Sequence, residues 1–280
     1  MVTIATTQRR RRSGLGMAMP AILLLLAFFV VPVVMLLTRS VTDPEPGLHN
    51  YAALLGSPTY GRIFFNTFFV SGLVTLITAL IAFPIAWALA IMPRLPAGIL
   101  FAVILLSMWT NLLTRTYAWM VMLQQTGIIN RMLQSIGLID TPIQLTNNLI
   151  GVTIGMVYIM LPFMILPLYG VIRKIDPAIL QAAALCGASR MQALVRVLLP
   201  LAAPGIASGG LMVFVMSLGY YVTPSLLGGT ANMMLAEFIV QQVQSLLNWG
   251  MGGAAAFVLL VVTLALYALQ LRLFEPRETR

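Results

Sequence analysis

Cysteine, histidine and lysine each occur only once in this chain of 280 residues, as Cys186, His49 and Lys174. A single cysteine excludes an internal disulfide framework, and a single histidine and cysteine cannot supply a multi-His or multi-Cys metal site. The sequence has no G-x-x-x-x-G-K-[ST] stretch, so it cannot bind ATP as a P-loop protein. It also has no set of residues for a Ser/His/Asp or Cys/His nucleophile. We therefore expect a protein that is not an enzyme and that binds no cofactor or metal itself.

Charge is scarce as well. Charged residues make up 8% of the chain and hydrophobic residues 60%, with a mean hydropathy of +0.97. This composition excludes an ordinary soluble domain and predicts an all-α polytopic membrane protein. The net charge of +9 would suggest a nucleic-acid partner in a soluble protein. Here it is better explained by the Lys/Arg bias that orients spans in a membrane, so we expect no nucleic-acid partner.

Long apolar runs predict six transmembrane helices in a single domain of residues 17–274, with short tails at 1–16 and 275–280. The predicted spans are 17–38, 63–92, 97–123, 149–172, 201–224 and 252–274. A signal peptide is the alternative for the first run. However, Arg39-Ser40-Val41 after it offers no small-x-small cleavage site, which favours an uncleaved span.

Proline and polar residues mark the places where the predicted membrane spans are interrupted or end. Prolines within the fourth and fifth spans predict that both spans face the bundle interior, where neighbouring groups can satisfy the freed backbone. Residues 42–62 are predicted to form an exposed loop, and residues 124–148 a loop with a short amphipathic helix at the membrane interface. Residues 233–247 are too short to cross comfortably and predict a re-entrant or outer-surface helix.

The basic residues decide the orientation. Six spans place both termini on one side, and with the termini inside, twelve of the sixteen Lys and Arg residues are inside. Arg39, Arg62 and Arg131 are outside, and Arg115 lies in a span. This asymmetry predicts cytoplasmic termini and places residues 173–200 in the cytoplasm.

Residues 173–200 predict two short helices joined by a glycine. Asp176 followed by Pro177 is typical of an N-cap and first helical position. Gly187 can end that helix in a left-handed conformation. Ser189 with Gln192 forms a capping box that begins the second helix, and Pro200 is expected to end it. An ordinary connector is the alternative, although about 28 ordered residues exceed the usual helix–helix connection.

The same stretch, Q-A-A-A-L-C-G-A-S followed by V-L-L-P, resembles the EAA loop of ABC-importer permeases. The resemblance implies a coupling loop that docks into a groove on a cytoplasmic ATPase. Gln181 replaces the Glu of the family pattern, and Ala184 stands where Asp is common, so an ion pair made by that Glu is missing or weakened. The implied ATPase-coupling residues are Gln181, Ala182, Ala183, Gly187, Ala188, Ser189 and Arg190.

Further patches resemble one subgroup, the spermidine/putrescine permeases. They include S-M-W-T-N-L-L-T-R-T-Y-A-W at 107–119, V-Y-I-M-L-P-F-M-I-L-P-L-Y at 157–169 and N-W-G-M-G-G-A-A at 248–255. The resemblance implies a bacterial inner-membrane subunit that pairs with a second permease subunit, two ATPase subunits holding ATP and Mg, and an extracytoplasmic binding protein. It implies a polyamine as solute, with opines, phosphonates or similar small solutes as alternatives. A self-contained secondary transporter is a further alternative, but it needs more intramembrane ionisable residues than this chain offers.

Polar and aromatic residues in or near the spans are the candidates for a substrate pathway. Arg115 should face a cavity or partner, or else extend to the outer headgroups. Glu237 and Gln241 share a helix face that could line the mouth of a pathway or be solvated. Tyrosine rings could bind an ammonium group, although packing or membrane-interface roles are the alternative. The candidates are Asn111, Thr114, Arg115, Tyr158, Tyr220, Tyr221, Glu237 and Gln241.

Overall fold

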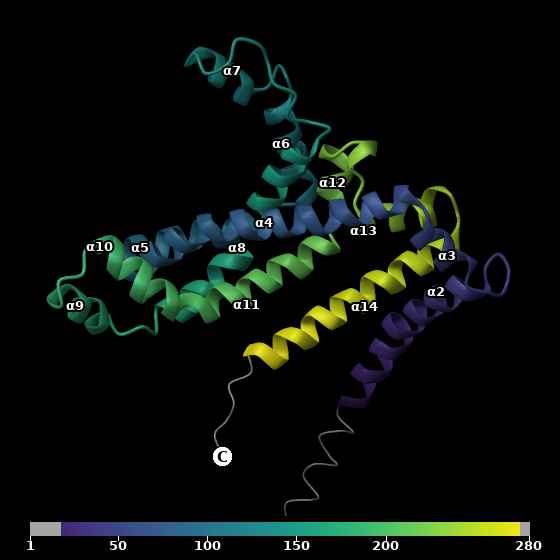
Figure 1. Ribbon diagram of the computed structural model, residues 1–280, viewed down its shortest axis with the longest axis horizontal. Helices are drawn as coiled ribbons and strands as arrows, with labels where there is room; N and C mark the ends of the chain where they lie inside the picture. The colour runs from purple at the N-terminus through teal and green to yellow at the C-terminus, as the bar shows by residue number, and fades with distance from the viewer. Residues whose placement is uncertain (1–17, 275–280) are drawn as a thin grey trace, which may run out of the picture.

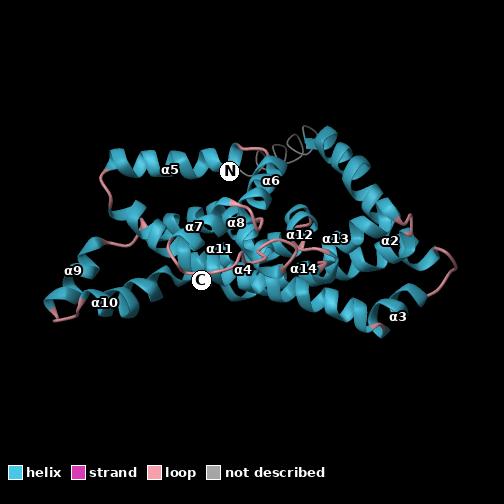
Figure 2. Ribbon diagram, turned by 90° about the horizontal axis from the view of Figure 1, so that it is seen from above, coloured by secondary structure: helices cyan, strands magenta, loops and turns pink. Residues whose placement is uncertain are grey.

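The computed structural model describes residues 18–274, and throughout this range the chain forms helices and connecting loops without a strand. Figure 1 shows α4, α8 and α11 running side by side, with α14 and α2 beyond them and α6 and α7 projecting from one face. Figure 2 shows α9 and α10 together at one end and α3 at the opposite end. All-α architecture is thus confirmed.

The elements follow one another in this order. They are η1 (Leu26–Val30), α2 (Val31–Thr42), α3 (His49–Gly56), α4 (Pro58–Ile91), α5 (Arg94–Trp109), α6 (Leu112–Leu123), α7 (Ile128–Ser135), α8 (Leu149–Ile172), α9 (Pro177–Leu185), α10 (Arg190–Ala193), η2 (Leu194–Leu198), α11 (Leu199–Leu218), α12 (Val222–Leu227), η3 (Thr230–Asn232), α13 (Leu235–Val240), η4 (Gln241–Ser245) and α14 (Trp249–Phe274).

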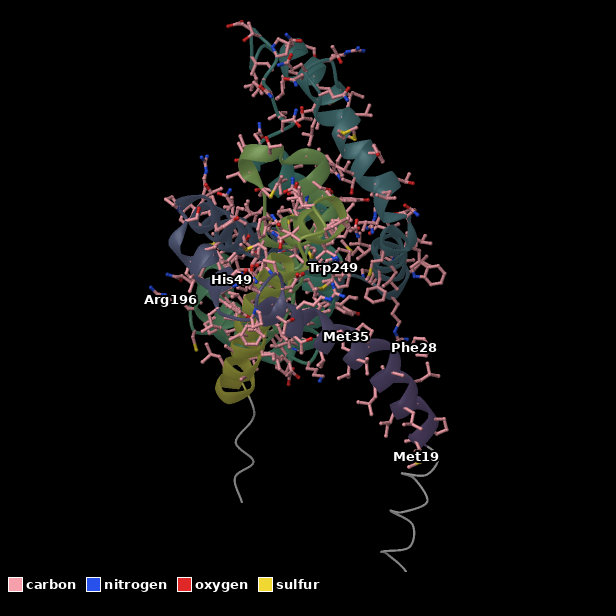
Figure 3. The ribbon with its side chains drawn as sticks, turned by 90° about the vertical axis from the view of Figure 1, so that its right-hand side faces the viewer. Met19, Phe28, Met35, His49, Arg196 and Trp249 are labelled. Atoms are coloured by element: carbon pink, nitrogen blue, oxygen red, sulfur yellow. The ribbon has the colours of Figure 1, made fainter. Side chains whose placement is uncertain are left out.

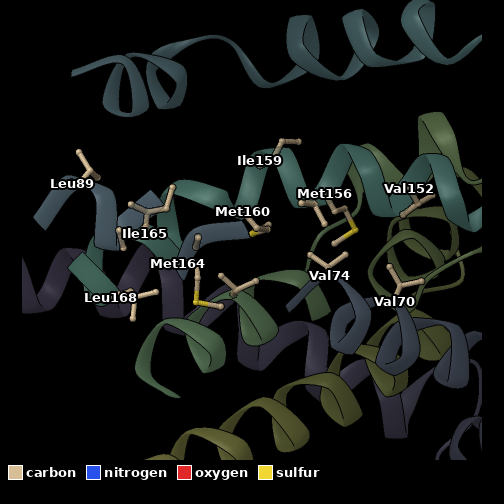
Figure 4. Close-up of a cluster of buried hydrophobic side chains, with 14 of the residues drawn as sticks. Val70, Val74, Leu89, Val152, Met156, Ile159, Met160, Met164, Ile165 and Leu168 are labelled. Carbon is tan, nitrogen blue, oxygen red and sulfur yellow. The ribbon is translucent and has the colours of Figure 1, made fainter. Parts of the chain in front are cut away.

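The core lies where α8 packs between α4 and α11. Met156, Met160 and Met164 of α8 are fully buried there, together with Val70 and Val74 of α4 (Figure 4). Methionine is flexible enough to fill the irregular space between helices. The prediction that the proline-containing α8 faces the interior is confirmed.

Glycines let α11 approach α8 closely. A Cβ on Gly209 would lie 2.8 Å from the Met164 sulfur, and one on Gly205 would lie 3.0 Å from the Val171 side chain. Gly205 and Gly209 are four residues apart and therefore lie on one helix face. Such a pair of small residues is typical of tightly packed membrane helices.

Five helices in the described range are long and apolar enough to cross a bilayer, and a bent pair is a sixth candidate. The bent pair corrects the predicted third span. The chain turns by 98° between α5 and the helical stretch that begins at Leu112, instead of continuing straight from 97 to 123. The break occurs because Asn111 caps α6, its side-chain oxygen accepting from the N–H groups of Leu113 and Thr114 at 2.9 and 3.3 Å.

The predicted stop at Pro200 is wrong, because α10, η2 and α11 form one uninterrupted helical stretch, Arg190–Leu218. Leu194–Leu198 form a π-helical turn directly before Pro200. A π turn shifts the hydrogen-bond register, and this local adjustment accommodates the missing N–H of Pro200 within the continuous helix. The coupling loop therefore continues without a break into the fifth span.

Residues 42–62 are also more ordered than predicted, because they contain α3. Asn50 of α3 is buried and donates to the Ser40 and Asp43 carbonyls at 3.0 and 2.8 Å. The Ser40 hydroxyl also bonds to the Tyr51 hydroxyl at 2.7 Å. His49, at the start of α3, is exposed (Figure 3).

The first span, Ala18–Thr42, packs on α14 along α2, whereas its most apolar part is uncovered. None of its most apolar window is buried, and Phe28 is 78% exposed. Figure 3 shows Met19, Phe28 and Met35 on a helix that extends away from the other spans. Only its C-terminal part packs on α14, where a Cβ on Gly253 would lie 2.5 Å from the Leu36 carbonyl.

Candidate functional site: the coupling loop and the distal region

Local hydrogen bonds hold the coupling loop, residues 173–200, in shape. The Asp176 side chain accepts from the Ala178 N–H at 2.9 Å, which confirms the predicted N-cap of α9. Gly187 has φ +84°, so the left-handed glycine is also confirmed. At the start of α10, Gln192 accepts from the Ser189 N–H at 2.8 Å, and the Ser189 hydroxyl accepts from the Gln192 N–H at 3.3 Å. The predicted capping box is therefore present.

The tip of the coupling loop is uncovered and partly apolar. Leu185 is 89% exposed and Met191 is 67% exposed, one on each side of the glycine turn. The proposed coupling residues surround them: Gln181, Ala182, Gly187, Ser189 and Arg190 are exposed, while Ala183 and Ala188 are half-buried. The resemblance to the EAA loop did not identify Leu185 and Met191 as coupling residues. Two large apolar residues beside a polar turn could have indicated a contact surface from the sequence alone. Such a surface suits a protein partner.

The inner side of the loop faces α4. A cavity of about 360 Å³ lies between them, lined by Trp87 of α4, Leu180, Ala184, Ala188, Arg190, Ala193, Leu194 and Leu198. Trp87 is half-buried, and its indole N–H has no hydrogen-bond partner among the described residues. The loop is therefore joined to the bundle by the unbroken helix into α11, and it shares this cavity with α4.

At the end of the bundle away from the coupling loop lies the distal region, formed by α6, α12 and α13 (Figure 1). The Arg115 guanidinium donates from Nη1 to the Ser107 carbonyl at 3.0 Å, across the bend between α5 and α6. Its Nε is buried without a partner in the described structure. Thr116 of α6 contacts Thr223 of α12 through their hydroxyls at 3.4 Å. Arg115 therefore supports the bend by satisfying a carbonyl at the end of α5.

Aromatic residues lie near α6 and α12 in the distal region. Tyr158 of α8 meets Trp119 of α6 edge to face, with ring centroids 5.6 Å apart. The Tyr220 hydroxyl is buried without a partner among the described residues, whereas Tyr221 is 43% exposed. Asn111 and Thr114 are exposed beside the bend.

A second polar group lies where α13 packs on α4. The Leu235 N–H at the start of α13 donates to the Thr67 hydroxyl of α4 at 2.8 Å. Beside this contact is a cavity of about 360 Å³, lined by Thr59, Tyr60, Arg62, Ile63, Asn66, Thr230, Ala231, Met233, Phe238 and Gln241. Of the lining residues, Gln241 was predicted from the sequence and Asn66 was missed. Thr67, beside the cavity, was missed as well, because both residues lie within an otherwise apolar run.

Glu237 of α13 is half-buried, and its Oε2 has no hydrogen-bond partner within the described range. Burial raises the pKa of its carboxyl above the ordinary value, and a hydrogen bond from the Met234 backbone acts in the opposite direction. This environment differs from the solvated face that was the alternative prediction.

Residues 73–280, about three-quarters of the chain, match the family described as "Binding-protein-dependent transport system inner membrane component". The chain belongs to this family.

Curated relatives agree with this assignment. The spermidine/putrescine transport system permease protein PotB of Haemophilus influenzae is 39% identical over 216 residues, covering 77% of this chain and 75% of the relative. PotB of Escherichia coli (strain K12) is 35% identical over 215 residues, covering 77% and 78%. The inner membrane ABC transporter permease protein YdcU of the same strain is 34% identical over 246 residues, covering 82% and 76%.

Solved structures share the fold of this permease. A bacterial ABC transporter involved in the import of the acidic polysaccharide alginate matches with a TM-score of 0.74, covering 95% of this chain and 97% of that chain. The sequence identity is 20%. The predicted permease fold and a transport role in place of catalysis are thus confirmed.

The structure divides the predicted pathway residues of the permease into two groups. Residues around α6, α8 and α12 form one group: Asn111, Thr114, Arg115, Tyr158, Tyr220 and Tyr221. Glu237 and Gln241 lie on the α13–η4 segment that packs on α4. Their contact with a solute stays a prediction.

Proposed function

We propose that this permease subunit imports a polyamine, spermidine or putrescine, in an ATP-driven complex. The identity of 35–39% to PotB proteins over 77% of the chain carries this proposal. The names of these relatives state the solute, and the matched region includes most of the membrane domain. The alternative is that the permease imports another small solute, such as an opine or a phosphonate.

The proposed complex contains a second permease subunit, two ATPase subunits that hold ATP and Mg, and an extracytoplasmic binding protein. The exposed coupling loop with Leu185 and Met191 at its tip supports an ATPase partner, since this chain has no P-loop of its own. The uncovered first span supports a membrane partner or lipid around it. A crystal structure of the alginate transporter in complex with a periplasmic protein is consistent with a binding-protein partner.

In the proposed mechanism, ATP-driven closure of the ATPase pair displaces the coupling loop and favours one of two arrangements of the spans. Arg190–Leu218 is a single helical stretch, so a displacement of α10 reaches the fifth span directly. Trp87 lines the cavity next to the loop, so closure of this cavity would carry the same displacement to α4. The chain itself supplies the mechanical connection and the solute path.

A polyamine path requires groups that stabilise ammonium ions. Glu237 is the one carboxylate of the predicted pathway set, and Tyr158, Tyr220 and Tyr221 offer aromatic faces. Arg115 keeps its positive charge and would repel a polycation, and its guanidinium is directed to the Ser107 carbonyl at the bend. We therefore assign Arg115 a positioning role at the bend, and we expect selectivity to depend largely on the binding protein.

The solute is tested with the assembled complex. The permease is purified with its co-assembling subunits and reconstituted in vesicles, and ATP hydrolysis is measured with the binding protein and one solute at a time. We expect spermidine or putrescine to stimulate hydrolysis and to accumulate in the vesicles. Stimulation by an opine or a phosphonate, with none by either polyamine, would replace the proposed solute.

The orientation is tested through Cys186, which is exposed on the coupling loop. With both termini in the cytoplasm, a membrane-impermeant maleimide should label Cys186 in inverted membrane vesicles and leave it unlabelled in intact cells. Labelling from outside intact cells would place the coupling loop on the wrong side and refute the mechanism.

A further inference from the structure

A cavity of about 380 Å³ lies where α4 ends, α5 begins and α8 ends, next to the coupling loop in the sequence. Its lining residues are Leu89, Ala90, Met92, Arg94, Ala97, Gly98, Phe101, Tyr169 and Arg173. α4 ends at Ile91 and α8 at Ile172, so the cavity is at the limit of two membrane spans. This is the depth at which lipid headgroups meet the helices of a membrane protein.

The charged residues that line this cavity in the described structure are both arginines. Arg94 and Arg173 are both exposed and contribute guanidinium groups, and no carboxylate lines the cavity among the described residues. Arg173 is held in place by Tyr169, to whose hydroxyl it donates at 3.2 Å and over whose ring it lies at 5.8 Å from the centroid. Asp176, the next acidic residue in the sequence, already accepts from the Ala178 N–H. The two guanidiniums are therefore available to an anionic ligand.

The backbone adds to this positive potential. Met92, Arg94, Ala97 and Gly98 place the first turn of α5 in the cavity wall. Within the described part of the chain, no side chain caps this 16-residue helix, because its N-cap residue is Pro93. The uncapped N–H groups and the positive end of the helix dipole favour an anion beside them. Arginine is especially suited to a phosphate group, which it can bind with two parallel hydrogen bonds.

The rest of the cavity is apolar and continuous with surface that faces the bilayer. Leu89 and Phe101 line the cavity, and the Phe101 ring packs on Tyr169 with centroids 5.7 Å apart. On the neighbouring surface, Ile91 is 65% exposed and Ile99 is 60% exposed. A free phosphate ion would leave this apolar surface uncovered, whereas the acyl chains of a lipid would bury it.

We propose that this cavity binds the phosphate headgroup of an anionic phospholipid, with Arg94 and Arg173 as its ligands and the acyl chains along α4 and α5. Basic pockets between membrane helices are a recognised way to bind such headgroups. The bound lipid connects the start of α5 to the end of α8, the span that leads directly into the coupling loop. This proposal concerns the permease chain alone and does not depend on the identity of the transported solute.

The test measures lipid retention by the purified complex with native mass spectrometry. The delipidated complex is titrated with phosphatidylglycerol or with phosphatidylcholine, and the variant Arg94→Gln/Arg173→Gln is compared with Arg131→Gln/Arg196→Gln. The control variant has the same net charge and changes two exposed arginines outside the cavity. We expect the wild type and the control to retain phosphatidylglycerol over phosphatidylcholine, and the cavity variant to bind it about tenfold more weakly.

Three outcomes would overturn the proposal. The first is equal retention of phosphatidylglycerol by the cavity variant and the control. In the second, millimolar inorganic phosphate displaces the lipid from the wild type, which would indicate a site for a free anion. In the third, the cavity variant loses its ATPase subunit while its lipid binding is unchanged, which would assign both arginines to a protein interface.

Discussion

α8 and the coupling loop are consecutive in the sequence and have opposite surroundings. In α8, 61% of the most apolar window is buried, whereas no residue of α9 or α10 is buried. α8 is held by α4 and α11, which pack along it, while the coupling loop is held by an N-cap, a left-handed glycine and a capping box. A span is thus fixed by its neighbours, and the loop by its own sequence. The two segments should respond to different kinds of substitution.

The largest effect is expected where α11 packs on α8. In Gly209→Leu, a side chain would overlap Met164 and Pro167, because even a Cβ would lie 2.8 and 3.1 Å from them. We expect a loss of about 3 kcal/mol of folding free energy, seen as a lower thermal midpoint and yield in detergent.

The matched control for Gly209→Leu is Gly72→Leu on α4. A Cβ on Gly72 meets nothing within 4 Å, and this residue borders an apolar cavity of about 460 Å³. We expect near wild-type stability for the control. Equal stability of both variants would show that the close approach of α11 to α8 is not needed.

A smaller effect is expected at the contact that fixes α13 to α4. In Thr67→Val, the Leu235 N–H loses its acceptor, and an unsatisfied buried donor costs about 1–3 kcal/mol. We expect faster hydrogen exchange in residues 235–240 and a lower thermal midpoint. The control Thr75→Val removes a hydroxyl that bonds only within its own helix, to the Ser71 carbonyl, and should change little. Unchanged hydrogen exchange in Thr67→Val would show that this hydrogen bond does not hold α13 on α4.

The coupling loop should lose function rather than stability. Gly187→Leu forces a side chain into the left-handed conformation at a cost of about 1–2 kcal/mol, although no neighbour obstructs its Cβ. We expect normal membrane insertion and loss of both transport and solute-stimulated ATP hydrolysis in the reconstituted complex. Gly187→Asn should retain more activity, because Asn tolerates this conformation. Full transport by Gly187→Leu would contradict the coupling role.

The same contrast explains how far the sequence could predict the structure. The bounds of α8 were predicted at 149 and 172, because polar Asn148 and Arg173 frame an unbroken apolar run. The caps of the coupling loop were predicted because capping uses residues within one turn of each other. Local chemistry of this kind is visible in the order of the residues.

Three other features of the structure were missed in the sequence. The bend at Asn111 lies inside an apolar run, and its signal, an Asn that can cap, was interpreted as a pathway residue. Pro200 was expected to end a helix, because proline usually does. The π turn that lets the helix continue has no recognisable pattern in the sequence. Asn130 belongs to the short amphipathic helix predicted within residues 124–148, where a polar side chain is expected to be exposed, yet it is buried and bonds to the backbone of Ile143. The cap at Asn111 is local and could have been predicted, whereas the π turn before Pro200 and the backbone partners of Asn130 are defined only by the folded chain.

The smallest effect is expected for Glu237→Gln in α13. Because burial raises the pKa of this carboxyl, the folded state favours the protonated form, so ionisation at neutral pH opposes folding. The amide removes this penalty, and after screening by solvent we expect a gain of about 0.5 kcal/mol at pH 8. The gain should vanish at a pH below the pKa of the unfolded state, where the carboxyl is protonated in both states. Thermal midpoints at the two pH values, with exposed Glu45→Gln as control, measure the difference. A lower midpoint of Glu237→Gln at pH 8 would mean that the ionised carboxylate has a stabilising partner in the assembled complex.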